Sequence, residues 1–502
     1  MPDPLDLLRI IGPLALLFLV GASLLRLFGI RFRSDPLAYL GWAFGSGCLG
    51  TGVILFAWLW TAPDLRSPLV PDLLLGAAAL VLFLLSWILP RATDPLAPEE
   101  QNPSSAPTTS VAPSPPWVRL ERGFFVLVVL AVLGIVLLRI ASASLEPMVA
   151  NDEAGIWSQK AKVLWLSGGF NEHYPKLLDF FPTPQKDYPL LNPILQVFEF
   201  VNWGRITLIA NRLPFQALSL ASVLVLAGSL RGLLRPSLAA LVLLMVASWR
   251  LFAWESFEGD GEVLVVFGSL MALDGWLRYR SGENRTGLPV LAIGLSVLAW
   301  SKNEALMIAA ALCLAALLHG LLTLARKKPL PKPTKALFVL IPPLLILGLG
   351  RAVNAHFGFE SPWARDPRGT LLDFFLNQFW DYGPIVLRYF RDEVFFYQAH
   401  SGFVALALLA WLLVFPKRLL LDGTIALPGL ALLGTWIAVM AVFVATPAEV
   451  HWHLITAAKR VAFQTMPACA LLLAAAATRV SPFLRPWRPA SVPMRVELSL
   501  PS

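Results

Sequence analysis

The chain has 502 residues, of which 57% are hydrophobic and only 14% are charged. A soluble globular domain carries about 25% charged residues, so the composition excludes an ordinary soluble protein. The formal net charge is +8 at pH 7. Because the basic residues recur in alternate loops between apolar segments, this charge indicates membrane topology and attraction to the inner leaflet, and it gives no support for a nucleic-acid partner.

Apolar runs recur from one end of the chain to the other. A helix needs roughly 20 apolar residues to cross the hydrocarbon core, and about thirteen runs approach this length. The runs are continuously apolar rather than alternating, which favours helices over a barrel. We therefore predict an all-α, polytopic transmembrane helical bundle, with spans near residues 7–25, 38–60, 69–89, 124–143, 206–229, 238–252, 263–277, 288–300, 305–324, 336–349, 403–415, 427–444 and 462–477.

Every second loop between these runs is basic. Arg31 and Arg33 follow the first run, and Lys327 and Lys328 follow a later one. The positive-inside rule assigns such loops to the cytoplasm, so we expect a multi-pass protein of the cytoplasmic membrane with its N-terminus outside and its C-terminus inside. The N-terminus has no basic region before its first run, which we therefore interpret as a retained span.

Composition also divides the chain. Residues 91–120 are rich in Pro and Ser and poor in large apolar residues, which predicts a disordered cytoplasmic linker. It separates three N-terminal helices (1–90) from a catalytic core (121–480) and a cytoplasmic tail (481–502). The three cysteines all fall in or beside apolar runs and form no metal-binding motif, so we expect no cofactor, and no divalent metal is indicated; they are Cys48, Cys313 and Cys469.

The first long outer loop opens with an acidic pair. Asp152 and Glu153 directly follow the fourth run. The next residues place Trp157 and several other apolar side chains at helical spacing, which predicts an amphipathic interfacial helix with Glu153 and Lys160 on its wetter side. Asn151 is also a good N-cap, and acidic residues in a first turn complement the helix dipole. The pair is thus either a helix start or part of a site.

Further acidic residues lie in other outer loops. Carboxylates at the edge of a bilayer are unfavourable when they are desolvated, so several of them together predict a shared wet cavity. Each could alternatively be a solvated loop charge, and the Lys–Asn–Glu segment could be a self-neutralising turn. The groups are Glu255, Glu258, Asp260 and Glu262, then Lys302, Asn303 and Glu304, and also Asp187, Tyr188 and Pro189.

These segments resemble a known family. The acidic pair after a span, the loop helix with Trp157, "DYPLLNPILQ" (187–196) and "SKNEAL" (301–306) resemble the bacterial lipid-linked-sugar glycosyltransferases of the GT-C superfamily. The nearest types are the protein O-mannosyltransferases and the aminoarabinose transferases of lipid A. The resemblance covers roughly residues 121 to 480. It implies a polyprenyl-phosphate-type sugar donor, transfer at the periplasmic or extracellular face to a glycan, lipid or protein acceptor, and a catalytic carboxylate in the first outer loop.

Transfer from a glycosyl phosphate requires a carboxylate base and a cation for the leaving phosphate. Asp152 or Glu153 could be the base. The last outer loop supplies a dense cationic group, although its Lys and Arg could instead anchor the next span by snorkelling, and two His at i and i+2 do not share a helix face. We therefore expect substrate binding by Trp157, Lys160, Asp187, Tyr188, Glu258, Asp260, Lys302, Asn303, Glu304, His451, His453, Lys459 and Arg460.

Two other features complete the prediction. The aromatic-rich outer segment 374–398 predicts a pair of interfacial helices over a lipid tail or acceptor, or an ordinary membrane-surface belt. A transporter or flippase is the alternative function. It should place ionisable residues at mid-bilayer, where this chain has few; Asp274 and Glu255 are the nearest exceptions. A non-catalytic scaffold would need no clustered carboxylates on one face.

Overall fold

The computed structural model describes residues 4–33, 35–61, 65, 67–88, 115–143, 152–181, 185–249, 252, 258–325, 333–360, 369–396, 407, 409, 410 and 423–486. Every element in these ranges is helical, which confirms the predicted all-α class. The elements are α1 (Pro4–Leu27), α2 (Pro36–Leu59), α3 (Leu69–Ile88), α4 (Pro116–Ala143), η2 (Glu153–Ser158), α5 (Gln159–Ser167), α6 (His173–Phe180), α7 (Leu191–Trp203), η3 (Ala210–Arg212), α8 (Leu213–Leu233), α9 (Pro236–Ser248), α11 (Glu262–Arg280), α12 (Asn284–Ser301), α13 (Asn303–Ala325), α14 (Pro333–Phe357), α15 (Leu371–Tyr389), η4 (Phe390–Phe396), α18 (Gly423–Val444), α19 (Val450–His453), η6 (Leu454–Ala458), α20 (Lys459–Phe463), α21 (Met466–Val480) and η7 (Pro482–Leu484).

Seven helices among the described residues are long and apolar enough to cross a membrane. An eighth span results if the bent pair Val450–Phe463 and Met466–Val480, whose axes differ by 40°, is counted as one. The chain is therefore a multi-pass membrane protein. The seven segments are Asp6–Leu27, Pro36–Leu59, Leu69–Ile88, Pro116–Ala143, Ala210–Leu233, Thr334–Phe357 and Gly423–Val444.

The expected number of about thirteen spans is not confirmed. The helix α9 has only 13 residues, and α12 has only 18. The helix α11 is long enough but contains Glu262, Asp274, Arg278 and Arg280. An apolar run in a sequence does not reveal whether its helix faces lipid or protein. In the structure, α11 and α12 are both largely buried inside the bundle.

Several expected boundaries differ from the structure. The expected span at 206–229 begins later, because η3 occupies residues 210–212 and α8 starts at Leu213. The expected linker 91–120 overlaps α4, which already begins at Pro116. Residues 89–114 and 487–502, and all but three residues of the expected span at 403–415, lie outside the described residues.

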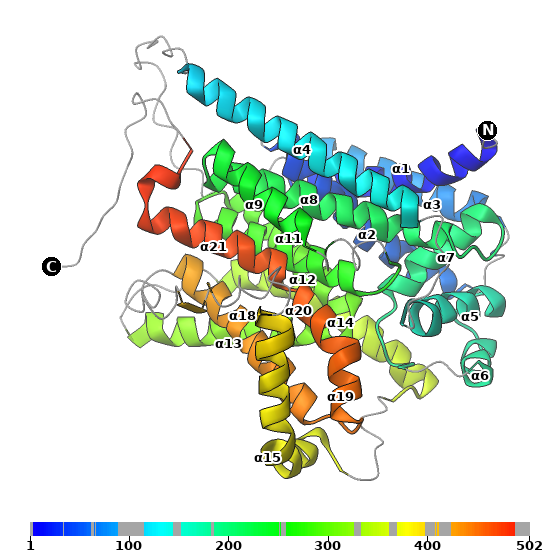
Figure 1. The fold of residues 1–502 in the computed structure, drawn as a ribbon. Helices are drawn as coiled ribbons and strands as arrows, with labels where there is room; N and C mark the ends of the chain where they lie inside the picture. Colours follow the sequence, from blue (N-terminus) through cyan, green and yellow to red (C-terminus); the bar gives the residue numbers. More distant parts are fainter. Residues whose placement is uncertain are drawn as a thin grey trace.

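The N-terminal helices pack into the bundle rather than standing apart from it. A Cβ on Gly47 of α2 would lie 1.7 Å from the carbonyl oxygen of Leu17 in α1. A Cβ on Gly41 would lie 2.6 Å from the carbonyl oxygen of Ala221 in α8. Small residues allow such close helix approach in membrane bundles. Figure 1 shows α2 beside α8, against which it packs, so helices from before and after the expected linker are in contact.

One end of α11 is tied to α2 by buried polar contacts. Trp42 Nε1 donates a hydrogen bond to Asp274 Oδ2 at 3.0 Å. Arg278 donates to Asp274 at 3.0 Å and to Asp35, directly before α2, at 2.7 Å. Asp274, which stood out in the sequence as a charge inside a span, is therefore held in a structural ion pair. The opposite end of α11 begins at Glu262, where a second polar cluster forms.

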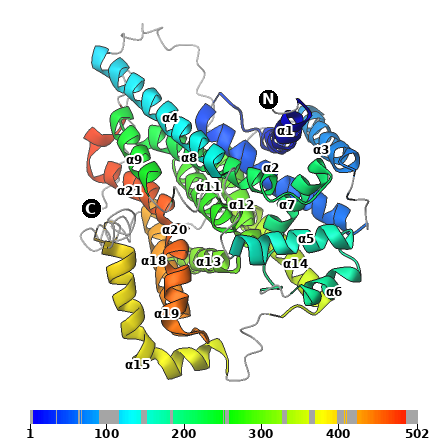
Figure 2. The ribbon, with the colours of Figure 1, turned by 45° about the vertical axis from the view of Figure 1, so that its right-hand side comes forward.

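The first long outer loop folds into packed short helices. η2 and α5 continue one another, and α5 packs against α6 and α7 on one flank of the bundle (Figure 2). The predicted apolar face is confirmed, because Trp157, Ala161 and Leu164 are buried. The predicted wetter side is wrong, since Glu153 and Lys160 are each 0% exposed. The helix is enclosed by protein on that side, so its charges meet polar partners in place of water.

The second long outer loop contains one long helix. α15 runs from Leu371 to Tyr389 and continues into the π-helical turn η4, in place of the expected helix pair. It begins with a capping box between Thr370 and Asp373 and packs against α18. Both ribbon views place α15 and α4 on opposite sides of the molecule.

Candidate functional site: an ionic cluster at the start of α11

Arg460 of α20 lies at the centre of a carboxylate cluster. Its Nη2 is 2.8 Å from Asp152 Oδ2. Its Nη1 is 3.4 Å from Asp260 Oδ2 and 3.7 Å from Glu262 Oε1. Asp152 directly precedes η2, and Asp260 lies in the turn before α11. Three segments that are distant in the sequence, and that are all predicted to lie outside, therefore meet at one guanidinium group.

Lys302 forms the second cationic centre. The chain is extended at this residue, with φ −157° and ψ 153°, between the end of α12 and the start of α13. Its Nζ lies 2.7 Å from Glu262 Oε1 and 3.8 Å from Glu304 Oε1. Glu262 thus joins Lys302 and Arg460 into one network. Lys302 is 4% exposed and Glu262 is 0% exposed, so the Lys–Asn–Glu segment is a buried junction between two helices rather than a solvated hairpin turn.

The Asp187–Tyr188 turn borders this network. Tyr188 donates its phenolic hydrogen to Glu304 Oε1 at 3.2 Å. Asn303 donates to Asp187 Oδ2 at 3.1 Å, and Lys160 Nζ donates to the carbonyl oxygen of Tyr188 at 2.9 Å. The structure therefore brings the predicted residues of three outer loops together. Burial, reinforced by the Glu304 carboxylate, keeps the pKa of the Tyr188 phenol well above its usual value.

Glu153 forms a buried ion pair with Arg212, which we call the Glu153–Arg212 latch. Both of its carboxylate oxygens accept hydrogen bonds from the Arg212 guanidinium, at 2.6 Å each, and Oε1 also accepts from the backbone N–H of Gly259 at 2.7 Å. A Cβ on residue 259 would lie 2.8 Å from Glu153 Oε1, so only glycine leaves room for this contact. Glu153 thereby fixes the turn that carries Glu258 and Asp260.

Sequence reasoning missed Arg212 and a set of buried amides. Asn192 donates to the carbonyl oxygen of Gly259 at 2.9 Å, and Gln196 donates to Asn192 at 2.8 Å. Ser158 and Asn211 each place a donor 2.8 Å from Gln196 Oε1. The sequence feature that could have indicated these buried amides is the spacing of Asn192 and Gln196, which lie one helical turn apart in an otherwise apolar segment. Polar groups so placed need internal partners once they are buried.

Trp157 packs against two segments of the cluster, the Tyr188 turn and the turn before α11. Its ring is fully buried, 5.5 Å from that of Tyr188. A Cβ on Gly261 would lie 2.8 Å from the indole, so the glycine lets the turn before α11 rest directly on the ring. Trp157 therefore sets the positions of Tyr188 and of the acidic turn. Its role in substrate binding stays a prediction.

The basic residues of the predicted last outer loop contact different partners and do not form one cationic group. Lys459 Nζ pairs with Glu393 Oε2 of η4 at 2.9 Å, and His453 Nδ1 lies 2.8 Å from Thr446 Oγ1. His451 is exposed on α19. Residues 459 and 460 project differently because neighbours in a helix differ by about 100°. From this loop, Arg460 forms ion pairs with the carboxylate cluster.

Two groups near the cluster titrate close to neutral pH. Burial raises the pKa of Glu258 to about 7, and the nearby Glu153 and Glu262 carboxylates add to the increase. Burial lowers the pKa of Lys160 to about 7, although the neighbouring Asp187 opposes this effect. The charge of the site therefore changes around pH 7. Glu255, the other member of the predicted acidic segment, lies outside the described residues.

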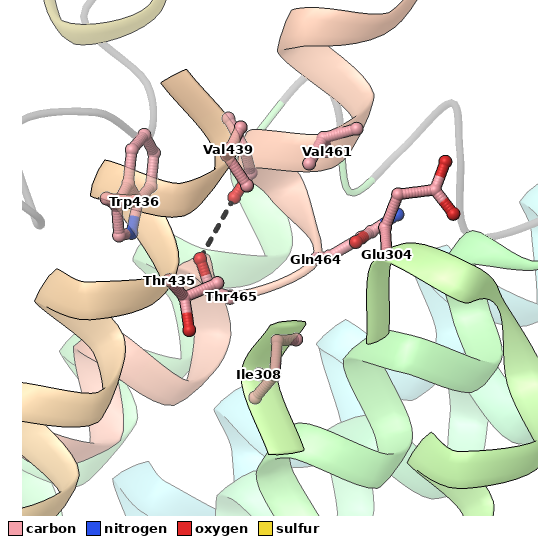
Figure 3. A pocket seen from close by; sticks show the side chains of 9 residues that line it. Glu304, Ile308, Thr435, Trp436, Val439, Val461, Gln464 and Thr465 are labelled. Atoms are coloured by element: carbon pink, nitrogen blue, oxygen red, sulfur yellow. Dashed lines mark hydrogen bonds between the residues drawn. The ribbon is translucent and has the colours of Figure 1, made fainter. Parts of the chain in front are cut away.

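An apolar pocket adjoins Glu304. Figure 3 shows its walls coming from α13, α18 and the break between α20 and α21. Glu304 Oε2 and Gln464 Nε2 are buried there without a hydrogen-bond partner. The other labelled lining residues are Ile308, Thr435, Trp436, Val439, Val461 and Thr465.

Fold and site together define a multi-pass, all-helical membrane protein with a buried ionic cluster where several interhelical segments meet. Comparison of the chain with protein-family models, curated proteins and solved structures finds no match. Within the described residues, no group of three or more His, Cys, Asp or Glu side chains is arranged to hold a metal ion.

Proposed function

We propose that the chain is a membrane glycosyltransferase of the GT-C type. It would move a sugar from a polyprenyl-phosphate-type donor to a glycan, lipid or protein acceptor at the outer face of the cytoplasmic membrane. The observation that carries the proposal is the contact between Asp152 and Arg460 at 2.8 Å. A carboxylate and a guanidinium side by side supply the two groups that displacement of a phosphate from an anomeric carbon requires.

The two side chains have separate roles in this mechanism. Arg460 turns from Asp152 to the donor phosphate, which it can bind with two parallel hydrogen bonds. Asp152, released from the ion pair, accepts the proton of the acceptor hydroxyl. The hydroxyl oxygen then bonds to the anomeric carbon, and the bond from that carbon to the phosphate oxygen breaks. The phosphate leaves with the electron pair, and Arg460 and Lys302 stabilise its negative charge.

Asp152 is a better candidate for the base than Glu153. The Asp152 side chain is 27% exposed, whereas that of Glu153 is 0% exposed. Both oxygens of Glu153 are already occupied by Arg212. A general base must reach the proton that it removes, within hydrogen-bonding distance. We therefore assign proton transfer to Asp152 and a positioning role to Glu153.

The pocket beside Glu304 suits the apolar part of such a donor. Ile308, Val439 and Val461 line it, and the ionic cluster begins at its rim. A polyprenyl phosphate has a charged head joined to a hydrocarbon chain, so it would place its head at Arg460 and Lys302, and the pocket would have to widen to admit the first isoprene unit.

One observation favours the alternative of a transporter or flippase. Among the described residues, ion pairs join four carboxylates (Asp152, Asp260, Glu262 and Glu304) to two cations (Arg460 and Lys302). This excess of negative charge suits a proton-coupled or cation-coupled site. In addition, both carboxyl oxygens of Glu199 in α7 are buried without a hydrogen-bond partner. Ionisable groups of this kind often mark proton pathways in membrane proteins.

Reconstitution separates the two functions. The purified protein in nanodiscs is supplied with a polyprenyl-phosphate sugar, and released polyprenyl phosphate is measured. A transferase cleaves the glycosyl–phosphate bond, whereas a flippase moves the intact donor between the leaflets of a liposome without cleavage. Glycolipid profiling of a deletion strain then identifies the accumulated lipid-linked sugar. Intact donor in every assay, together with unchanged glycolipids, contradicts the transferase.

A further inference from the structure

A second cleft lies behind the Asp187–Tyr188 turn. It is bounded by this turn and by the helices α12, α13 and α14. Leu306 and Leu347 contribute apolar walls. The polar lining consists of Asp187, Asn303, Arg351 and Asn354, together with the backbone of the turn. This is a different space from the pocket beside Glu304, with which it has no lining residue in common.

Asp187 presents one carboxylate oxygen without a partner at this cleft. The residue is only 6% exposed. Its Oδ2 accepts a hydrogen bond from Asn303 at 3.1 Å, but Oδ1 is buried with no hydrogen-bond partner among the described residues. Buried polar atoms in proteins are almost always paired. Because an ionised carboxylate only accepts hydrogen bonds, Oδ1 requires a donor such as a hydroxyl group.

The turn that carries Asp187 is held firmly. Gln185 has a left-handed backbone with φ 51°, unusual for a residue other than glycine. Asn354 donates to the carbonyl oxygen of Asp187 at 2.8 Å, and Lys160 donates to that of Tyr188 at 2.9 Å. The free oxygen therefore occupies a fixed position. Such support is typical of preorganised binding groups.

Arg351 adds a positive charge to the same cleft. It belongs to α14, it is exposed, and it forms no ion pair with any residue in the described ranges. Guanidinium groups bind phosphate and carboxylate through a planar fork of donors. The cleft thus offers a fixed acceptor for a hydroxyl group and a separate donor for an anion.

We propose that this cleft binds a polyol with an anionic substituent, whose hydroxyl group donates to Asp187 Oδ1 while its anionic group contacts Arg351. A soluble sugar phosphate and the headgroup of phosphatidylglycerol share this chemistry. The binding site exists independently of the transfer reaction. Only its use as the acceptor site would rest on the proposed glycosyltransferase activity, and Asn303 and Tyr188 would then connect it to the ionic cluster.

Binding is measured with the full-length protein in phosphatidylcholine nanodiscs, without any sugar donor. Glucose 6-phosphate and glucose are titrated in one arm. In the other arm, native mass spectrometry compares retention of phosphatidylglycerol with that of phosphatidylcholine. The variants are Asp187→Asn, which keeps an oxygen for Asn303 but turns the free position into a donor, and Arg351→Gln. Arg388→Gln is the matched control, since Arg388 is an exposed helix arginine 80% open to solvent.

The favoured probe should bind about 10- to 100-fold more weakly to either variant, the range expected for loss of a hydrogen bond to a charged group. Arg351→Gln should also remove the preference for the phosphorylated probe over glucose, and the control should bind as the wild type does. Binding in the first arm identifies a soluble saccharide, and retention in the second identifies a lipid headgroup. Binding in neither arm, or equal binding by wild type and both variants, overturns the proposal. Because no donor is present, that failure leaves the transfer reaction untouched.

Discussion

Arg460 Nη2 lies 2.8 Å from Asp152 Oδ2, although the two residues belong to the first and last outer segments of the predicted core. In this arrangement Asp152 shares the guanidinium group with Asp260 and Glu262. A donor phosphate would compete with Asp152 for the guanidinium group and, by displacing it, free the carboxylate to act as a base. Donor binding and activation of the base would therefore be coupled through one side chain.

Substitution of Arg460 tests this coupling. Arg460→Gln should weaken donor binding and turnover together, because an arginine on a phosphate contributes in both the ground state and the transition state. Binding of a polyprenyl phosphate and the rate of sugar transfer are measured on the same preparation. Arg388→Gln is the matched control, since Arg388 is a helix arginine that is 80% exposed to solvent. If Arg460→Gln binds donor as the wild type does, the phosphate does not contact this residue.

The Glu153–Arg212 latch should contribute strongly to stability. Glu153→Gln leaves Arg212 buried with less compensation, and removal of one partner of a buried ion pair destabilises proteins by about 3–5 kcal/mol. Unfolding in detergent should therefore occur at a clearly lower temperature. Glu172→Gln provides the matched control. Glu172 Oε2 lies 3.7 Å from Lys176 Nζ, and both side chains are largely exposed. Ion pairs at the surface contribute little to stability. Equal midpoints for both variants would show that the latch is not structural.

Glu258 should make stability depend on pH. Its pKa is raised from 4.5 to about 7 in the folded protein, chiefly by burial. Between these values the folded protein keeps a proton that the unfolded chain has released, so stability falls as the pH rises through this window and levels off above it. Glu258→Gln removes this effect. The thermal midpoint of Glu258→Gln relative to wild type should increase from pH 4.5 to 7, and a constant difference contradicts the shifted pKa.

The sequence predicted much of the helical framework and the composition of the cluster. Apolar runs located α1, α2, α3 and α18 to within a few residues, because each of these helices is apolar on most sides, whether it is largely buried as α2 is or largely exposed as α3 is. The basic loops assigned Asp152, Asp260, Lys302 and Arg460 to one side of the membrane, and the structure brings these residues together.

The sequence did not predict the partners of the buried charged residues. Arg212 lay inside an apolar run and so passed as part of a span, whereas it ends η3, directly before α8, and binds Glu153. Lys160 fitted a solvated helix face but is enclosed by the Tyr188 turn. A local pattern shows that a charge interrupts an apolar face, but it does not show which distant segment brings the compensating partner.

Membrane topology is open to a direct test by labelling. In a variant with its three cysteines replaced by alanine, Lys176→Cys should react with a membrane-impermeant maleimide in intact cells. Ser281→Cys should react only after lysis, because the basic segment after α11 is predicted to be cytoplasmic. Both positions are exposed to solvent in the structure. The reverse pattern of labelling would invert the proposed orientation and place the ionic cluster on the cytoplasmic side.

The most direct test of the central proposal is the turnover of Asp152→Asn in nanodiscs with a polyprenyl-phosphate sugar and its acceptor. General-base catalysis contributes about 10² to 10⁴ in rate, so transfer should fall by this factor. Donor binding should be largely retained, because the carboxylate acts mainly in the transition state. Glu172→Gln serves again as the exposed control and should turn over normally. Transfer by Asp152→Asn at the wild-type rate would contradict the assignment of Asp152 as the base and with it the proposed mechanism.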